Sequence, residues 1–151
     1  MSANSLSVQS AWPESRVGEF LKTYRAPLRL AVNDVSGFPL ICSLWSHYEG
    51  GRLFCATTRQ SKVVSRLRED PKCGFELAPN EPPYFGVRGH GLATVRAEGA
   101  IELLGSLVDR YVGSRDTKFS KWLLGRTEDE VAIEIDIQWM TSWDYSGRMS
   151  K

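Results

Sequence analysis

Hydroxyl and cationic side chains gather in residues 57–62, where the sequence changes from a strand-like to a helix-like pattern. Thr57, Thr58 and Ser61 supply the hydroxyls, and Lys62 supplies an ammonium group at the expected helix start. Ser61 is a good N-cap, so its oxygen is expected to accept a backbone N–H of the first turn. Free N–H groups, hydroxyls and cations together bind anions well. These four residues, called the anion cradle below, therefore predict a site for a phosphate group.

The charges around this helix start favour a bound anion. The N-terminus of a helix carries a partial positive charge and prefers acidic neighbours, whereas this one is flanked by Arg59, Lys62 and Arg66. An anion bound between these cations would offset their repulsion from the positive end of the helix. The alternative is a capped surface helix with solvated cations, because a basic helix start costs only about 0.3–1 kcal/mol.

The composition is that of one soluble domain without a broad charged field. The chain has 151 residues, of which 42% are hydrophobic and 25% are charged, and its formal net charge is +1. These values fit a globular domain and give little support to nonspecific nucleic-acid binding. Residues 1–10 lack the basic start and apolar segment of a signal peptide or a membrane anchor. We expect a cytoplasmic protein with a disordered tail over residues 1–12, a single domain over residues 13–151 and no membrane partner.

Cysteines and histidines are few, and their spacing favours neither a disulfide framework nor a metal site. Cys42, Cys55 and Cys73 are odd in number, and two of them lie within apolar strand patterns. Buried free thiols are therefore expected. His47 and His90 lack the spacing of metal ligands. No Ser-His-Asp or Cys-His catalytic arrangement can be assembled from these residues, so no side-chain nucleophile is expected.

The elements expected to position the anion cradle form a mainly antiparallel pattern. Alternating or continuous apolar runs predict strands over residues 28–32, 40–46, 53–56, 72–77, 84–97 and 131–137, the last able to continue to 145. Helical spacing predicts helices over residues 13–24, between Ser61 and Asp70, over 101–111 and around 119–123. No long parallel crossover is present. The order therefore predicts a mainly β fold, a small antiparallel barrel with peripheral helices.

Three glycines interrupt the long strand over residues 84–97. Gly86, Gly89 and Gly91 stand among good β-formers, where glycine weakens a strand. Glycines so placed mark either the close approach of another backbone or a flat ligand, or a strong bend of a barrel. The sequence leaves both interpretations open.

Four separated motifs resemble the split-barrel flavin-binding family typified by pyridoxamine-phosphate oxidase, which includes enzymes that use the deazaflavin coenzyme F-420. They are the hairpin over residues 40–54, the phosphate segment 57–62 with the Arg-Glu-Asp-Pro that follows, Val-Arg-Gly-His-Gly-Leu-Ala over 87–93 and Ser-Trp-Asp-Tyr-Ser-Gly-Arg-Met over 142–149. Their order and spacing match the family over residues 27–149. The resemblance implies a split β-barrel with an FMN-binding fold, FMN or F-420 as the cofactor, and a homodimer with the cofactor between two barrels.

The same resemblance implies roles for individual residues. The cofactor-binding residues would be the anion cradle, which would hold the phosphate; Ser43, Leu44 and Trp45, which would border the isoalloxazine ring; and Trp143, which would approach from the partner chain. Arg88 and His90 lie on the same side of their strand and would face a substrate. The alternatives are a core or dimer contact for the two tryptophans, and a solvated surface position for Arg88 and His90.

Departures from the family pattern argue against vitamin B6 oxidation. Ser46 stands where the oxidases carry a lysine, and the sequence ends at Lys151 without their arginine-histidine tail. Cys55 and Gln60 also differ from the oxidases, which leaves the choice between FMN and F-420 open. The resemblance implies an oxidoreductase that transfers a hydride between the bound flavin and a small organic substrate. The alternative is a non-catalytic dimeric module that binds flavin or haem.

Overall fold

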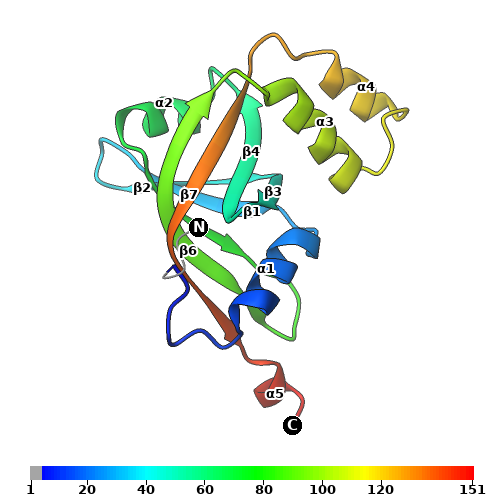
Figure 1. The fold of residues 1–151 in the computed structure, drawn as a ribbon. Coiled ribbons are helices and arrows are strands. Elements are labelled where there is room, and N and C mark those ends of the chain that lie inside the picture. The colour runs from blue at the N-terminus through cyan, green and yellow to red at the C-terminus, as the bar shows by residue number, and fades with distance from the viewer. Residues whose placement is uncertain (1–4) are drawn as a thin grey trace.

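Alternating burial along the strands gives one sheet with a mainly apolar inner face. The computed structural model describes residues 5–151, and its seven named strands pair antiparallel in the order β2-β1-β5-β6-β7-β4-β3 (Figure 1). The strands are β1 (Leu28–Asn33), β2 (Pro39–Leu44), β3 (Ser46–Glu49), β4 (Arg52–Thr58), β5 (Lys72–Leu77), β6 (Phe85–Arg96) and β7 (Glu130–Asp144). The helices are α1 (Glu14–Thr23), α2 (Lys62–Glu69), α3 (Ala100–Tyr111), α4 (Lys118–Leu124) and α5 (Ser146–Met149).

Strands β2 and β3 are consecutive in the chain but lie at opposite edges of the sheet, and the sheet curls into a half-barrel between them. β2 pairs with β1 at one edge, and β3 pairs with β4 at the other. The chain crosses between these edges at Trp45, and β2 approaches β4 there. The return from β3 to β4 is a tight turn in which Gly50 and Gly51 both have positive φ. The expected mainly β barrel with peripheral helices is confirmed.

The main core fills the inside of this curled sheet. Leu30 of β1 and Ile133 and Ile135 of β7 are completely buried there. Helix α1 contributes Val17 and Leu21, and helix α2 contributes Val63, Val64 and Leu67. Burying such side chains stabilises the fold by about 1.5–3 kcal/mol each. Helices α1 and α2 are therefore fixed to the barrel by their apolar faces.

Helix α3 covers the other face of the sheet, over β4 and β7. Leu104, Leu107 and Val108 of α3 are buried, as is Ala132 on the outer side of β7. These residues lie outside the main core cluster. Helix α3 thus makes a second, smaller apolar layer, and outward-facing residues at the start of β7 are buried beneath it.

Gly89 and Gly91 of β6 lie where the backbone of the neighbouring strand β7 comes unusually close. A Cβ on Gly89 would lie 2.3 Å from the backbone oxygen of Trp139, and one on Gly91 would lie 2.3 Å from that of Asp136. The pairing of β6 with β7 shifts register between His90 and Gly91. The two interpretations therefore hold together, because the backbone of β7 approaches Gly89 and Gly91 closely where the strand pairing is irregular.

Two segments differ from the sequence-based expectation. The tail expected over residues 1–12 is ordered from residue 5 onward, because Ser7 donates its N–H to the Met140 carbonyl and Trp12 donates Nε1–H to Asp144. Residues 1–4 lie outside the described part of the chain. The last strand runs without a break over Glu130–Asp144, and the short helix α5 follows it unpredicted.

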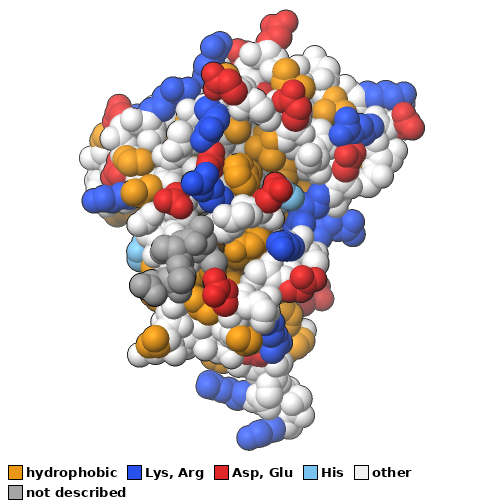
Figure 2. All heavy atoms as spheres, viewed as in Figure 1, with side chains coloured by type: hydrophobic (Ala, Val, Ile, Leu, Met, Phe, Trp, Pro, Cys, Tyr) orange, Lys and Arg blue, Asp and Glu red, His pale blue; other side chains and the backbone are white. Residues whose placement is uncertain are grey.

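Charged side chains of both signs are interspersed over the face seen in Figure 2. This distribution agrees with the small net charge of +1. Within the described residues, no helix has the length and apolar character needed to span a membrane.

Candidate functional site

The structure brings together five of the predicted cofactor-binding residues around one hollow. Ser43, Leu44 and Trp45, at the end of β2, face Thr57 and Thr58, at the end of β4. The hollow has a volume of about 290 Å³ and is completed by Ala56, Leu104, Leu107, Phe119, Leu123 and Glu130. It is called the α3–α4 hollow below. The residues predicted for the ring thus lie beside Thr57 and Thr58 of the anion cradle, whereas Ser61 and Lys62 do not line the hollow.

Aromatic side chains form one wall of this hollow. The ring of Trp45 stacks on Tyr111 of α3 with centroids 5.2 Å apart and an interplanar angle of 4°, and Phe119 of α4 meets Trp45 edge-on at 6.1 Å. The Tyr111 hydroxyl accepts the Ser46 N–H and donates to the Ala26 carbonyl. Tyr111 therefore fixes the crossing segment to α3, and this holds Trp45 in place.

Ser61 occupies the N-cap position of α2 without making the predicted cap. Its φ and ψ are −64° and 147°, as expected for an N-cap, but its side chain accepts no first-turn N–H. The Ser61 Oγ is buried and has no hydrogen-bond partner among the described residues. The expected cap bond is therefore wrong. The Ser61 hydroxyl is thus buried at the start of α2 without a partner in the described part of the chain.

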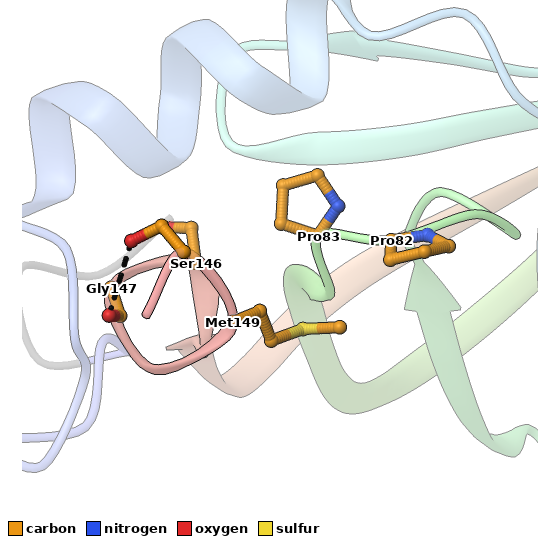
Figure 3. A pocket seen from close by; sticks show the side chains of 6 residues that line it. Pro82, Pro83, Ser146, Gly147 and Met149 are labelled. Carbon is orange, nitrogen blue, oxygen red and sulfur yellow. Dashed lines mark hydrogen bonds between the residues drawn. The ribbon is translucent and has the colours of Figure 1, made fainter.

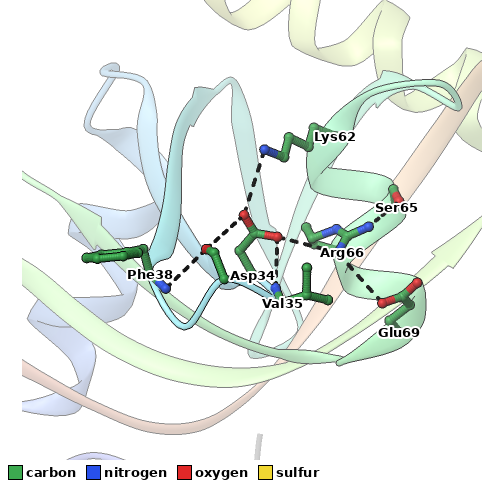
Figure 4. A network of polar contacts seen from close by, with 8 residues as sticks. Asp34, Val35, Phe38, Lys62, Ser65, Arg66 and Glu69 are labelled. Atoms are coloured by element: carbon green, nitrogen blue, oxygen red, sulfur yellow. Dashed lines mark hydrogen bonds and ion pairs between the residues drawn. The ribbon is translucent and has the colours of Figure 1, made fainter.

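The cations of α2 share an internal carboxylate. Figure 4 shows Lys62 and Arg66 pointing from α2 toward Asp34, which follows β1. The Lys62 Nζ lies 3.7 Å from one Asp34 oxygen, and an Arg66 nitrogen lies 3.4 Å from the other. Burial acts to raise the pKa of Asp34, but the Val35 N–H and the two cations outweigh it and hold this pKa below its ordinary value.

Carboxylates of the same chain therefore neutralise part of the positive charge at the start of α2. Arg59 also has a carboxylate partner, since its guanidinium lies 2.7 Å from Asp129. Lys62 remains the least restrained of these cations, because its side chain is 66% exposed and its contact with Asp34 is long. It is the cation best placed to turn toward an external anion.

Glu130 lines the α3–α4 hollow and was missed by the sequence interpretation. It pairs with Thr58 across β4 and β7 and is only 8% exposed. Burial raises the pKa of Glu130, and the charge of Arg126 offsets part of this effect. Glu130 lies on the same face of β7 as Ala132 and Glu134. The acidic run Glu128-Asp129-Glu130 is the one signal in the sequence, and it is equally typical of an exposed loop.

Trp143, Arg88 and His90 lie away from the α3–α4 hollow. Arg88 lies over the ring of Trp143 at 5.6 Å, and His90 stacks on Trp139 with centroids 5.5 Å apart. Arg88 and His90 project from the same side of β6, as predicted, and both are exposed. Within one chain these residues do not meet the predicted ring and phosphate groups.

An apolar hollow of about 500 Å³ opens on the outer face of the sheet next to them. It is lined by Arg29, Ala31, Ile41, Gly74, Phe75, Glu76, Arg88, Gly89 and Trp139. Ile41 is 65% exposed and Trp139 is 36% exposed on this face. This surface, called the outer sheet face below, exposes the apolar side chains of Ile41 and Trp139 next to Arg88.

The cysteines are free thiols, as predicted. Cys55 and Cys73 are buried and Cys42 is partly buried. Burial raises the pKa of the Cys73 thiol to about 11 and also raises that of Cys55. The described residues contain no group of three or more Cys, His, Asp or Glu side chains able to hold a metal ion.

A further hollow lies at the opposite end of the barrel. Figure 3 shows Pro82 and Pro83 facing Met149 of α5 across it. Its volume is about 560 Å³, and its lining contains no titratable side chain. Its polar side chains are the hydroxyls of Ser146 and Ser150.

Solved structures share this fold at low sequence identity. A conserved hypothetical protein from Mycobacterium tuberculosis superposes with a TM-score of 0.75 at 22% identity, over 93% of this chain and 89% of that one. An F-420 reductase gives 0.69 at 19% identity, over 86% of this chain and 98% of its own. A Listeria innocua protein proposed to be a pyridoxamine 5'-phosphate oxidase gives 0.58 at 14% identity, over 78% and 88%. No family model and no curated protein matches the sequence. The split-barrel fold expected from the sequence is confirmed.

Proposed function

We propose that this split barrel binds FMN or coenzyme F-420 and transfers a hydride between the bound ring and a small organic substrate. The single observation that carries the proposal is the α3–α4 hollow, which gathers Ser43, Leu44 and Trp45 beside Thr57 and Thr58. The F-420 reductase among the structural neighbours supports a flavin-type cofactor for this fold. Vitamin B6 oxidation is not part of the proposal, because Ser46 replaces the family's lysine.

The anion cradle would hold the cofactor phosphate. Ser61 supplies a buried hydroxyl without a partner, and Lys62 supplies an exposed ammonium group one residue later. A phosphate between them would pair both groups and would also face the positive end of α2. The donor set fits a phosphate, which accepts several hydrogen bonds at once.

Trp45 and the backbone on either side of it would border the cofactor ring. The hollow of one chain, at about 290 Å³, lies at the lower limit of ligand pockets, which span about 300–1,000 Å³. A second chain over this hollow would enlarge the enclosed volume to the size that a flavin needs. Trp143 of a second chain would complete it, and Arg88 and His90 would face the substrate.

The bound flavin would supply the hydride chemistry, so the protein needs no nucleophile of its own. This chain's residues would orient the ring and exclude water from it, with Trp45 and Phe119 on one side. The test is anaerobic reduction of the reconstituted protein, followed by a panel of small organic acceptors. We expect at least one acceptor to reoxidise the flavin faster than oxygen does. If oxygen outpaces every acceptor, the hydride-transfer proposal is wrong.

We place the contact of the proposed homodimer on the outer sheet face, where Ile41 and Trp139 are exposed next to Arg88, and therefore predict a strong effect of charge there. We expect the wild-type chain to sediment as a dimer and Ile41→Asp to sediment as a monomer, because a carboxylate at the centre of an apolar interface would be buried without a partner. Val8→Asp is the matched control, since Val8 is fully exposed, and it should leave the dimer intact. Two variants with the same sedimentation coefficient would contradict the proposed interface.

A further inference from the structure

Glu130 is a buried carboxyl without a hydrogen-bond partner for one of its oxygens. Its side chain lines the α3–α4 hollow and is 8% exposed, and no group in the described part of the chain pairs with Oε2. Burying a polar atom that finds no partner costs free energy, and native proteins retain few such atoms. An unpartnered carboxyl oxygen in a hollow is explained most simply by a ligand group that pairs with it.

The surroundings of Glu130 raise the pKa of its carboxyl. The other side chains of the hollow come from the crossing segment and from β4, α3 and α4, and none of them titrates in the ordinary pH range. Arg126, which precedes β7, is the charged group that acts on Glu130, and its effect is smaller than that of burial. The pKa of Glu130 therefore lies above its ordinary value, and the protonated form persists to higher pH than in an exposed glutamate.

We propose that the Glu130 carboxyl donates a hydrogen bond to an uncharged acceptor, a carbonyl oxygen or a ring nitrogen, of the molecule that occupies the α3–α4 hollow. A protonated carboxyl has one O–H to donate, so it fits such an acceptor better than a phosphate. This inference rests on the proposed function, because FMN and F-420 both carry carbonyl oxygens at one end of the ring system. Glu130 then acts as a ligand-binding residue beside Thr58, its cross-strand partner in the lining of the hollow.

The test compares FMN binding by the wild-type chain and by Glu130→Gln between about pH 5 and about pH 8. Glutamine keeps the shape and a donor N–H but does not titrate. We expect similar affinities at low pH and a wild-type affinity about tenfold below that of Glu130→Gln at high pH. The titration of the FMN phosphate is common to both proteins, so the difference between them reports Glu130. Glu128→Gln, which changes an exposed carboxyl two residues earlier, should follow the wild-type profile.

A second measurement detects the titration of Glu130 in the protein without any ligand. A carboxyl whose pKa is raised in the folded state contributes stability at low pH, and this contribution is lost as the pH rises through the raised value. The unfolding free energy of the wild-type chain should therefore fall with rising pH relative to that of Glu130→Gln. Parallel stability profiles would overturn the protonated carboxyl and with it the inference.

The outcomes separate the inference from the proposed function. If FMN binds and the wild type and Glu130→Gln share one pH profile, Glu130 makes no such hydrogen bond, while the flavin-binding proposal stands. If neither FMN nor F-420 binds the wild-type chain, both are wrong. A wild-type affinity that falls relative to Glu130→Gln as the pH rises supports both.

Discussion

Replacing Lys62 with alanine should weaken FMN or F-420 binding by about 10- to 150-fold. The expected loss is that of one charge-assisted hydrogen bond, about 1.5–3 kcal/mol. Lys62 is suited to this role because its side chain is 66% exposed and its contact with Asp34, at 3.7 Å, is long. It can turn toward a phosphate without breaking a buried pair. The measurement is an equilibrium titration of each protein, followed by flavin fluorescence.

The control for this variant is Lys22→Ala. Lys22 lies on the exposed side of α1, in a helix that does not line the α3–α4 hollow. Both substitutions remove one surface ammonium group, so they change the net charge equally. Lys22→Ala should bind FMN like the wild type. Equal affinities of the Lys62→Ala and wild-type chains would remove Lys62 from the anion cradle.

Replacing Gly89 with alanine should destabilise the fold by at least about 2 kcal/mol. A Cβ at this position would lie 2.3 Å from the Trp139 carbonyl oxygen and 2.8 Å from the ring of Phe75. The first of these atoms belongs to the backbone of β7, which cannot move without disturbing the pairing of β6 with β7. The measurement is the free energy of unfolding by urea.

Gly74→Ala is the matched control for Gly89. Gly74 lies on the neighbouring strand β5, and the nearest atom to an added Cβ is the Gly89 carbonyl oxygen, at an ordinary contact distance of 3.7 Å. Its free energy of unfolding should lie within about 0.5 kcal/mol of the wild-type value. If both variants unfold at the same urea concentration, the close approach of β7 does not explain the glycine at 89.

Helices and strands were predictable where proline or another turn-forming residue marks their ends. Strand β5 was expected over residues 72–77 and has these bounds, since Pro71 precedes it and a proline-rich loop follows it. The bend of β6 was ambiguous because glycine permits several arrangements, and only the position of β7 selects one of them. The order of residues 5–12 was missed because it depends on bonds to Met140 and Asp144, which are distant in sequence.

Part of the residue arrangement around the α3–α4 hollow was also predictable from local sequence signals. Ser43–Trp45 and Thr57, which the sequence predicts as cofactor-binding residues, line one hollow, because a hairpin and a strand end bring them together. Glu130 was missed because alternation along β7 places it on the outer face, and local periodicity does not reveal that α3 and α4 cover that end. The predicted cap bond of Ser61 was wrong because N-cap propensity ranks residue types at a position and does not determine where the hydroxyl points.

A crystal structure of the chain grown with FMN or F-420 tests the central claim most directly. We expect the cofactor phosphate within hydrogen-bond distance of the Ser61 Oγ and the Lys62 Nζ, with the ring against Trp45 in the α3–α4 hollow. A cofactor bound elsewhere on the barrel, or a hollow that stays empty at saturating cofactor, would contradict the account.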